Sequence, residues 1–109
     1  MARRVNRGDI WMYRFGPPDK RRPVVVLSRT DAIDWLDTVM VAPITTTIRG
    51  LPSEIVLGVE HGLKTDSAVN LDHVQTVRQN DLRRYVSALG APEMTAVCRA
   101  LAIAAACAT

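Results

Sequence analysis

Hydrophobic and polar positions along this chain alternate with a period of two over much of its length, which predicts short β-strands. Residues 10–15 alternate in this way and are rich in aromatic side chains, which favour extended structure. Residues 24–27 are uniformly aliphatic, as in a strand that is buried on both faces. By the same criteria, further strands are predicted at residues 39–41, 53–57, 68–71, 74–77 and 84–89.

Two segments favour helices instead. Residues 28–36 form a short amphipathic segment that Ser28 or Thr30 would cap. Pro92 fits the first turn of a C-terminal helix, because its missing N–H is not needed there. An apolar stripe predicts that this helix continues to about Cys107, and it consists of Met94, Val97, Leu101 and Ala104 or Ala105.

Several short strands and one terminal helix predict a mainly β fold. The strands would form a small, curled antiparallel sheet or partly open barrel, with the helix packed across it. Glycine and proline interrupt the chain too often for an all-helical fold. The sequence has no internal repeat and no low-complexity linker, so we expect residues 1–109 to form one domain.

The stretch 37–50 is the most informative part of the chain. A strand over residues 39–41 is expected to end at Pro43, and the hydroxyls of Thr45, Thr46 and Thr47 follow, then Arg49. Alternation would put Thr45 and Thr47 on one face and Thr46 on the other. Hydroxyl donors beside an arginine fit a phosphate or oxyanion site. Threonines are also common at solvent-facing strand positions that have no function.

Charge adds a second indication. The net charge is +3, and twelve of the 14 basic residues are arginines. Arginine grips phosphate with two parallel hydrogen bonds, which favours nucleic acid or an acidic partner. A high-GC genome would produce the same arginine bias together with the alanine-rich tail, so composition leaves both explanations open.

The sequence lacks the motifs of metal sites, cofactor sites and membrane segments. The sequence holds no HxxxH, CxxC or carboxylate cluster and no phosphate-binding glycine loop, so we expect neither a metal nor another cofactor. No apolar run is long enough for a signal peptide or a membrane span. Cys98 and Cys107 are too far apart along one helix to pair, which predicts buried, reduced cysteines and a cytoplasmic location.

Two short motifs carry candidate chemistry. Arg21-Arg22-Pro23 precedes the aliphatic strand and could clamp a phosphate, because Pro23 stiffens the backbone there; two solvated arginines are the alternative. Asp72-His73 lies between two predicted strands. His73 could act as a general acid or base, or it could be a surface histidine without a role.

Four blocks of the sequence together resemble the MazF/PemK (Kid) family of toxins from bacterial type II toxin–antitoxin systems. They occur in the family's order and cover nearly the whole chain from Arg7. The blocks are Arg7-Gly8-Asp9-Ile10-Trp11, Arg22-Pro23-Val24-Val25-Val26-Leu27-Ser28, Val41-Ala42-Pro43-Ile44-Thr45-Thr46, and Asp66-Ser67-Ala68-Val69-Asn70-Leu71-Asp72 with Gln75-Thr76.

The resemblance implies a Src-homology-3-like, partly open antiparallel β-barrel of the CcdB/MazF type, with a C-terminal helix. It also implies a homodimer that cleaves single-stranded mRNA at specific sequences without a metal ion, and that a MazE-like antitoxin inhibits. The family's catalytic arginine and threonine fall on Arg22 and Thr45. We expect RNA contacts from Arg21, Thr46, Thr47, Arg49, Asp72, His73 and Gln75.

Departures from the family leave room for another function. The loop before Arg22 is short where many relatives carry a longer segment that holds RNA, and Asp72-His73 stands where relatives often have Glu-Gln. The alternative hypothesis is a non-enzymatic inhibitor or RNA-binding module on the same fold, like CcdB. The chain lacks the C-terminal Trp-Gly-Ile that CcdB uses against gyrase, which argues against that target.

Overall fold

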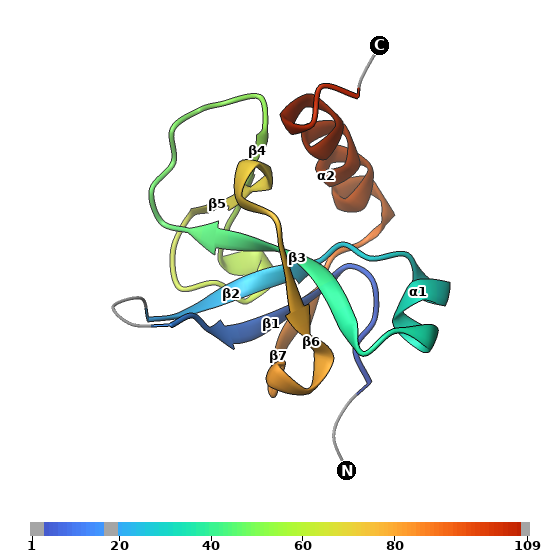
Figure 1. Ribbon diagram of the computed structural model, residues 1–109. Coiled ribbons are helices and arrows are strands. Elements are labelled where there is room, and N and C mark those ends of the chain that lie inside the picture. The colour runs from blue at the N-terminus through green and yellow to red at the C-terminus, as the bar shows by residue number, and fades with distance from the viewer. Residues whose placement is uncertain (1–3, 17–19, 108–109) are drawn as a thin grey trace.

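A computed structural model describes residues 4–16 and 20–107 (Figure 1). The predicted turn at residues 16–20 therefore lies largely outside the described residues, as does the start of the basic N-terminal arm. The strands are β1 Asp9–Arg14, β2 Arg21–Val26, β3 Thr38–Thr45, β4 Glu54–Leu57, β5 Ser67–Asn70, β6 Gln75–Arg78 and β7 Arg84–Ala88. The helices are α1 Thr30–Trp35 and α2 Ala91–Ala104, with short 3-10 turns at Val59–His61, Leu71–His73 and Gln79–Asp81.

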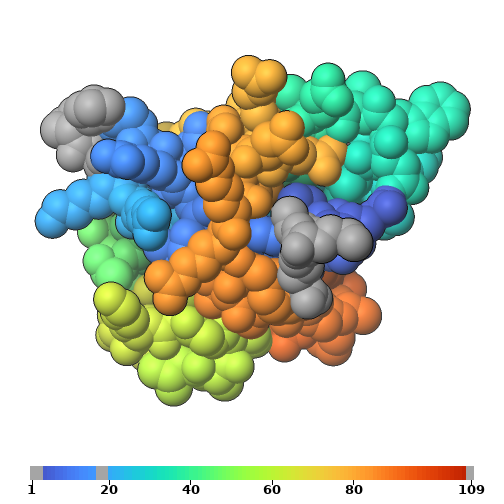
Figure 2. Space-filling model, turned by 90° about the horizontal axis from the view of Figure 1, so that it is seen from below, coloured from blue at the N-terminus to red at the C-terminus, as the bar shows by residue number. Residues whose placement is uncertain are grey.

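The strands form one curled antiparallel sheet in the order β4-β5-β3-β2-β1-β7, and β6 pairs with β3. The long strand β3 begins beside α1 and ends beside β5 (Figure 1). It pairs first with β6 and then with β5 on the same side, and this change of partner bends the sheet into a half-barrel. In the view from below, the segment around β6 and β7 (orange) separates α1 from the yellow-green loop that follows β4 (Figure 2). The predicted fold class is confirmed.

Hydrophobic side chains are buried on both faces of this sheet. One cluster lies under α2 and includes Ile10, Val25, Ile44, Val69 and Val97. The other lies on the opposite face and includes Trp11, Val24, Val26, Val39 and Val41. Neighbouring valines of β2 therefore enter different clusters, which explains why residues 24–26 are all aliphatic and confirms the predicted central strand.

The predicted break at Pro43 is wrong, because β3 continues through it to Thr45. Pairing with β6 ends at Val41 and pairing with β5 starts at Ile44. Pro43 thus occupies the gap between these two partners, where a missing N–H costs no ladder hydrogen bond on that side.

Strand β2 begins earlier than predicted, at Arg21 rather than Val24. Arg21 and Arg22, which the sequence places before the strand, pair with Arg14 and Tyr13 of β1. Pairing of β2 with β3 starts only at Val24, so Pro23 lies where β2 still has a free side.

The predicted cap of α1 is also wrong. Helix α1 follows Arg29, which makes no side-chain cap, while the Ser28 hydroxyl accepts the N–H of Met40 in β3 at 2.8 Å. In α2 the predicted stripe is confirmed, because Val97 is buried and Met94, Leu101 and Ala104 pack on the same cluster. Neither described helix is long and apolar enough to cross a membrane.

The prediction of buried cysteines is wrong, although both thiols are free as expected. Cys98 follows Val97 in α2 but lies off the face that packs on the sheet, and it is exposed. Cys107 is exposed because α2 ends at Ala104, before the predicted end of the helix.

Candidate active site

A cavity of about 410 Å³ lies where β2 begins and β3 ends, and it collects most of the predicted site residues. Its lining comes from four separate stretches of the chain. The lining residues are Phe15, Arg22, Pro43, Thr45, Thr47, Arg49, Asn70, His73 and Gln75. The described residues of the lining include two arginines, a histidine and no carboxylate, so the cavity favours an anionic ligand.

The register between β2 and β3 explains why Arg22 and Thr45 meet in this cavity. Val24 lies opposite Pro43 in this antiparallel pair. Arg22 and Thr45 each lie two residues beyond this last pair, so alternation puts both side chains on the same face, and both line the cavity. The strands β2 and β3 thereby bring the guanidinium and the hydroxyl into one cavity.

The Thr45 hydroxyl is oriented by the backbone that follows it. Its oxygen accepts the N–H of Thr47 at 3.2 Å. Since a hydroxyl has a single proton, the O–H of Thr45 is left to donate in another direction. The turn also brings Thr47 back to the same cavity, while Thr46 faces elsewhere, as the alternation predicted.

Arg49 reaches the cavity from a loop that a buried carboxylate organises. One oxygen of Glu54, Oε1, accepts the backbone N–H groups of Arg49, Gly50 and Leu51 at 3.1, 3.0 and 3.3 Å. Gly50 has a φ of +72°, a left-handed conformation that strongly favours glycine. These contacts fix the backbone from which the Arg49 side chain extends.

The sequence did not identify Asn70 or Phe15 as site residues. Asn70 is buried at the end of β5, where its side chain contacts His73 and the backbone of Asp72. An asparagine immediately before Leu71-Asp72-His73 could have been recognised as a cap for the turn. Phe15 comes directly after β1 and continues the alternation of Trp11 and Tyr13, which was the available signal.

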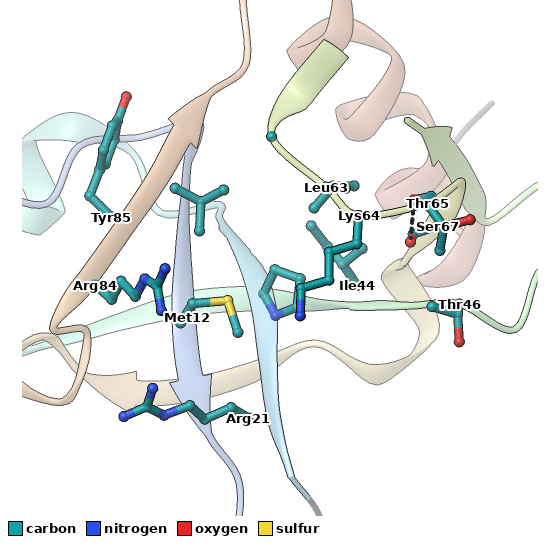
Figure 3. A pocket seen from close by; sticks show the side chains of 13 residues that line it. Met12, Arg21, Ile44, Thr46, Leu63, Lys64, Thr65, Ser67, Arg84 and Tyr85 are labelled. Carbon is teal, nitrogen blue, oxygen red and sulfur yellow. Dashed lines mark hydrogen bonds between the residues drawn. The ribbon is translucent and has the colours of Figure 1, made fainter. Parts of the chain in front are cut away.

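Three of the predicted RNA contacts lie outside this cavity. Arg21 and Thr46 line a second groove of about 540 Å³, together with Lys64, Arg84 and an apolar floor that includes Met12 (Figure 3). The third, Asp72, accepts a hydrogen bond from the Ser53 hydroxyl at 2.5 Å. Its carboxylate therefore stabilises the fold beside the cavity.

A curled half-barrel closed by one C-terminal helix is the fold of a class of small bacterial toxins. The solved structure of Mycobacterium tuberculosis toxin MazF-mt6 superposes with a TM-score of 0.82 at 37% identity, covering 90% of this chain and 96% of that chain. Residues 6–105 match the family described as PemK-like, MazF-like toxin of type II toxin–antitoxin system. The chain belongs to this family, which confirms the resemblance seen in the sequence.

Curated relatives from Mycobacterium tuberculosis carry the same family name. The protein named Probable endoribonuclease MazF5 is 46% identical over 104 residues, which are 93% of this chain and 93% of that protein. Endoribonuclease MazF3 is 41% identical over 83 residues, covering 76% and 81%. A mycobacterial endoribonuclease in complex with its cognate antitoxin shares the fold, with a TM-score of 0.83 at 21% identity and coverage of 96% and 98%.

Proposed function

We propose that this chain is an endoribonuclease toxin that cleaves single-stranded mRNA in the cavity between Arg22 and Thr45. Two curated relatives named as endoribonucleases support the class of activity. The observation that carries the proposal is that an arginine of β2 and a hydroxyl donor of β3 line the same cavity, whose described lining residues include no carboxylate. Such an arrangement suits a phosphate that gains negative charge during reaction.

In the proposed mechanism the RNA supplies its own nucleophile. The 2′-hydroxyl attacks the adjacent phosphorus and releases its proton to water, the bond from phosphorus to the 5′-oxygen breaks, and the 5′-oxygen takes up a proton. The products are a 2′,3′-cyclic phosphate and a 5′-hydroxyl. Arg22 stabilises the charge on the non-bridging oxygens, because a guanidinium binds such oxygens through a planar pair of donors. A guanidinium has only N–H donors and no acceptor, so Arg22 is a poor general base and is suited instead to donating a proton toward the leaving oxygen.

Thr45 complements Arg22 by donating its O–H to a non-bridging oxygen of the same phosphate. We propose that these two side chains replace the charge stabilisation that a metal ion gives in other nucleases. Among the described residues, no group of three or more histidine, cysteine, aspartate and glutamate side chains could hold a metal ion. Cleavage is accordingly expected to proceed in EDTA.

Recognition of the RNA sequence requires unpaired bases. Phe15 supplies an aromatic face on which a base can stack, and Arg49, His73 and Gln75 supply polar groups that can contact base edges or phosphates. These residues surround Arg22 and Thr45, so we propose that they select the nucleotides next to the cleaved bond.

We further propose that a MazE-like antitoxin inhibits the chain through an acidic segment bound in the second groove. Arg21, Lys64 and Arg84 line that groove, and its floor is apolar. None of the described residues that line it is a carboxylate. An acidic chain with apolar side chains complements both features.

Homodimerisation and a cytoplasmic location remain part of this proposal, and light scattering of the purified chain tests the dimer.

Substitutions in the cavity test the proposal. Arg22→Ala and Thr45→Val are each expected to lower the rate of cleavage of a long single-stranded RNA by about 10²-fold or more. Arg99→Ala removes an exposed arginine on α2, outside the cavity, and is the control for charge alone. Equal activity in all three variants would overturn the assignment. Binding of intact RNA without cleavage by the wild type would favour the non-enzymatic alternative.

A further inference from the structure

The orientation of the Asn70 side chain is determined by a backbone group. The N–H of Asp72 donates to Oδ1 of Asn70 at 3.0 Å. A backbone N–H can only donate, so the amide oxygen must face Asp72 and the amide NH₂ must face the other way. Asn70 is 7% exposed and pairs with Glu54 across the β4–β5 ladder, so this orientation is held by the sheet.

The amide NH₂ in turn determines which nitrogen of the neutral His73 ring carries the hydrogen. Nδ2 of Asn70 lies 2.6 Å from Nδ1 of His73. Because Nδ2 has no lone pair to offer, it donates, and Nδ1 of the imidazole accepts. A neutral imidazole carries one N–H, so that hydrogen lies on Nε2.

The backbone around His73 is held as well. Asp72 is hydrogen-bonded through its side chain to the Ser53 hydroxyl, which ties the Leu71–His73 turn to the segment before β4. His73 itself is exposed and lines the cavity that contains Arg22 and Thr45. Its Nδ1 edge faces Asn70, so Nε2 lies on the opposite edge of the ring.

We propose that Asn70 is a positioning residue that makes His73 a hydrogen-bond donor to bound RNA through Nε2–H. The sequence suggested that His73 could act as a general base, which needs a lone pair on Nε2. The contact with Asn70 places the hydrogen on Nε2, so no lone pair is available there. The acceptor is an oxygen or nitrogen of the nucleotide in the cavity, either on the phosphate or on a base edge. The identity of the ligand, RNA, rests on the proposed function, whereas the tautomer of His73 does not.

The tautomer can be measured without RNA. The chain contains only two histidines, so the imidazole ¹⁵N signals of the protein are simple to assign by comparison with His73→Gln. In long-range ¹H–¹⁵N spectra recorded at a pH where the ring is neutral, His73 is expected to be protonated on Nε2. Protonation on Nδ1 would overturn the inference while leaving the proposed function untouched.

Asn70→Asp is the matched variant, because it keeps the shape of the side chain and replaces its donor by an acceptor. The carboxylate would accept both the Asp72 N–H and an N–H on His73 Nδ1, which moves the lone pair of His73 to Nε2. Cleavage is expected to fall by about 10²-fold, as for loss of one donor in a catalytic site. Wild-type activity in a variant with the shifted tautomer would overturn the role of His73.

The added charge of Asn70→Asp is controlled in a double-mutant cycle with His73→Gln, which has no tautomer to shift. A loss that is larger with His73 present than with glutamine supports the donor role, and an equal loss in both backgrounds contradicts it. In His73→Leu, a loss confined to certain RNA sequences identifies a base as the acceptor, whereas a uniform loss identifies the phosphate. Absence of RNA cleavage in the wild type would refute the proposed function but not the tautomer.

Discussion

At the scale of single residues, Thr45 shows how the fold prepares a side chain for chemistry. Its hydroxyl oxygen is engaged by the N–H of Thr47, and its proton remains available to the cavity. Thr45→Ser keeps this arrangement and is expected to retain most activity. Thr45→Val keeps the shape but removes the donor, so kcat is expected to fall by about 10²–10³-fold. Single-turnover cleavage rates distinguish the two variants, and similar rates would contradict the assigned role.

Not every residue behind the family resemblance belongs to the site. Asp9, in the first block, is buried and accepts the N–H of Asn6 at 2.8 Å and the indole N–H of Trp11 at 3.1 Å. Its neighbour Gly8 has a φ of +87°, donates its backbone N–H to the carbonyl of Val26 and accepts the N–H of Leu89. This block therefore ties the N-terminus to β2 and β7, and its role is structural.

Sequence patterns located part of the cavity at this scale. Alternation was sufficient to separate Thr45 and Thr47 from Thr46, because the side-chain period of a strand is two. The same rule separates Arg21 from Arg22, but only once both are known to lie in β2. Asn70 was missed because its partners depend on a tight turn at Leu71–His73, whose geometry no pattern of hydrophobic residues reveals.

At the scale of elements, the loop between β3 and β4 depends on Glu54. Three backbone N–H groups converge on its carboxylate, and Glu54→Ala would leave them without this acceptor. We expect a loss of about 1–3 kcal/mol in the free energy of unfolding and faster amide hydrogen exchange at residues 49–51. Glu60→Ala removes an exposed carboxylate and is the control. Unchanged exchange at residues 49–51 would contradict this account of the loop.

The start of α2 gives the fold a dependence on pH. The pKa of the Glu93 carboxyl is held below its ordinary value of 4.5, first by a hydrogen bond from its own backbone N–H and then by one from His61. His61 Nε2 lies 3.3 Å from Glu93, and its Nδ1 lies 3.3 Å from Glu60. A lowered pKa means that the folded state binds the proton less readily than the unfolded state.

This contribution of Glu93 to stability is therefore complete above pH 4.5 and disappears as the pH falls through the lower, folded-state value. Glu93→Gln cannot titrate, so its unfolding free energy is expected to change less between pH 6 and pH 3 than that of the wild type. Urea denaturation at several pH values measures the difference. Parallel curves for the two proteins would show that Glu93 has no such role.

Element boundaries were harder to predict than the elements themselves. The aliphatic run of β2 and the stripe of α2 were predicted because burial leaves a direct mark on sequence. The continuation of β3 through Pro43 was not, because it depends on where one neighbouring strand ends and the next begins. That information is carried by the pairing of distant segments.

At the scale of the whole molecule, the start of β2 and the end of β3 lie between two grooves. Arg22, Thr45 and Thr47 face one groove, and the alternate residues Arg21 and Thr46 face the other. One pair of strands thus contributes to both the proposed site of cleavage and the proposed site of inhibition. The fold class could be predicted from the number of short strands and the terminal helix. The division of these residues between two grooves could not, because it depends on how β2 and β3 pair.

The central claim is that the cavity promotes attack by the RNA's own 2′-hydroxyl, with charge stabilised by Arg22 and Thr45. End-group analysis of a labelled single-stranded RNA, incubated with the purified chain in EDTA, tests this most directly. The account predicts a 2′,3′-cyclic phosphate and a 5′-hydroxyl, and no cleavage at a bond whose 2′-hydroxyl is replaced by hydrogen. A 5′-phosphate product, cleavage at the 2′-deoxy bond, or activity that disappears with EDTA would contradict it.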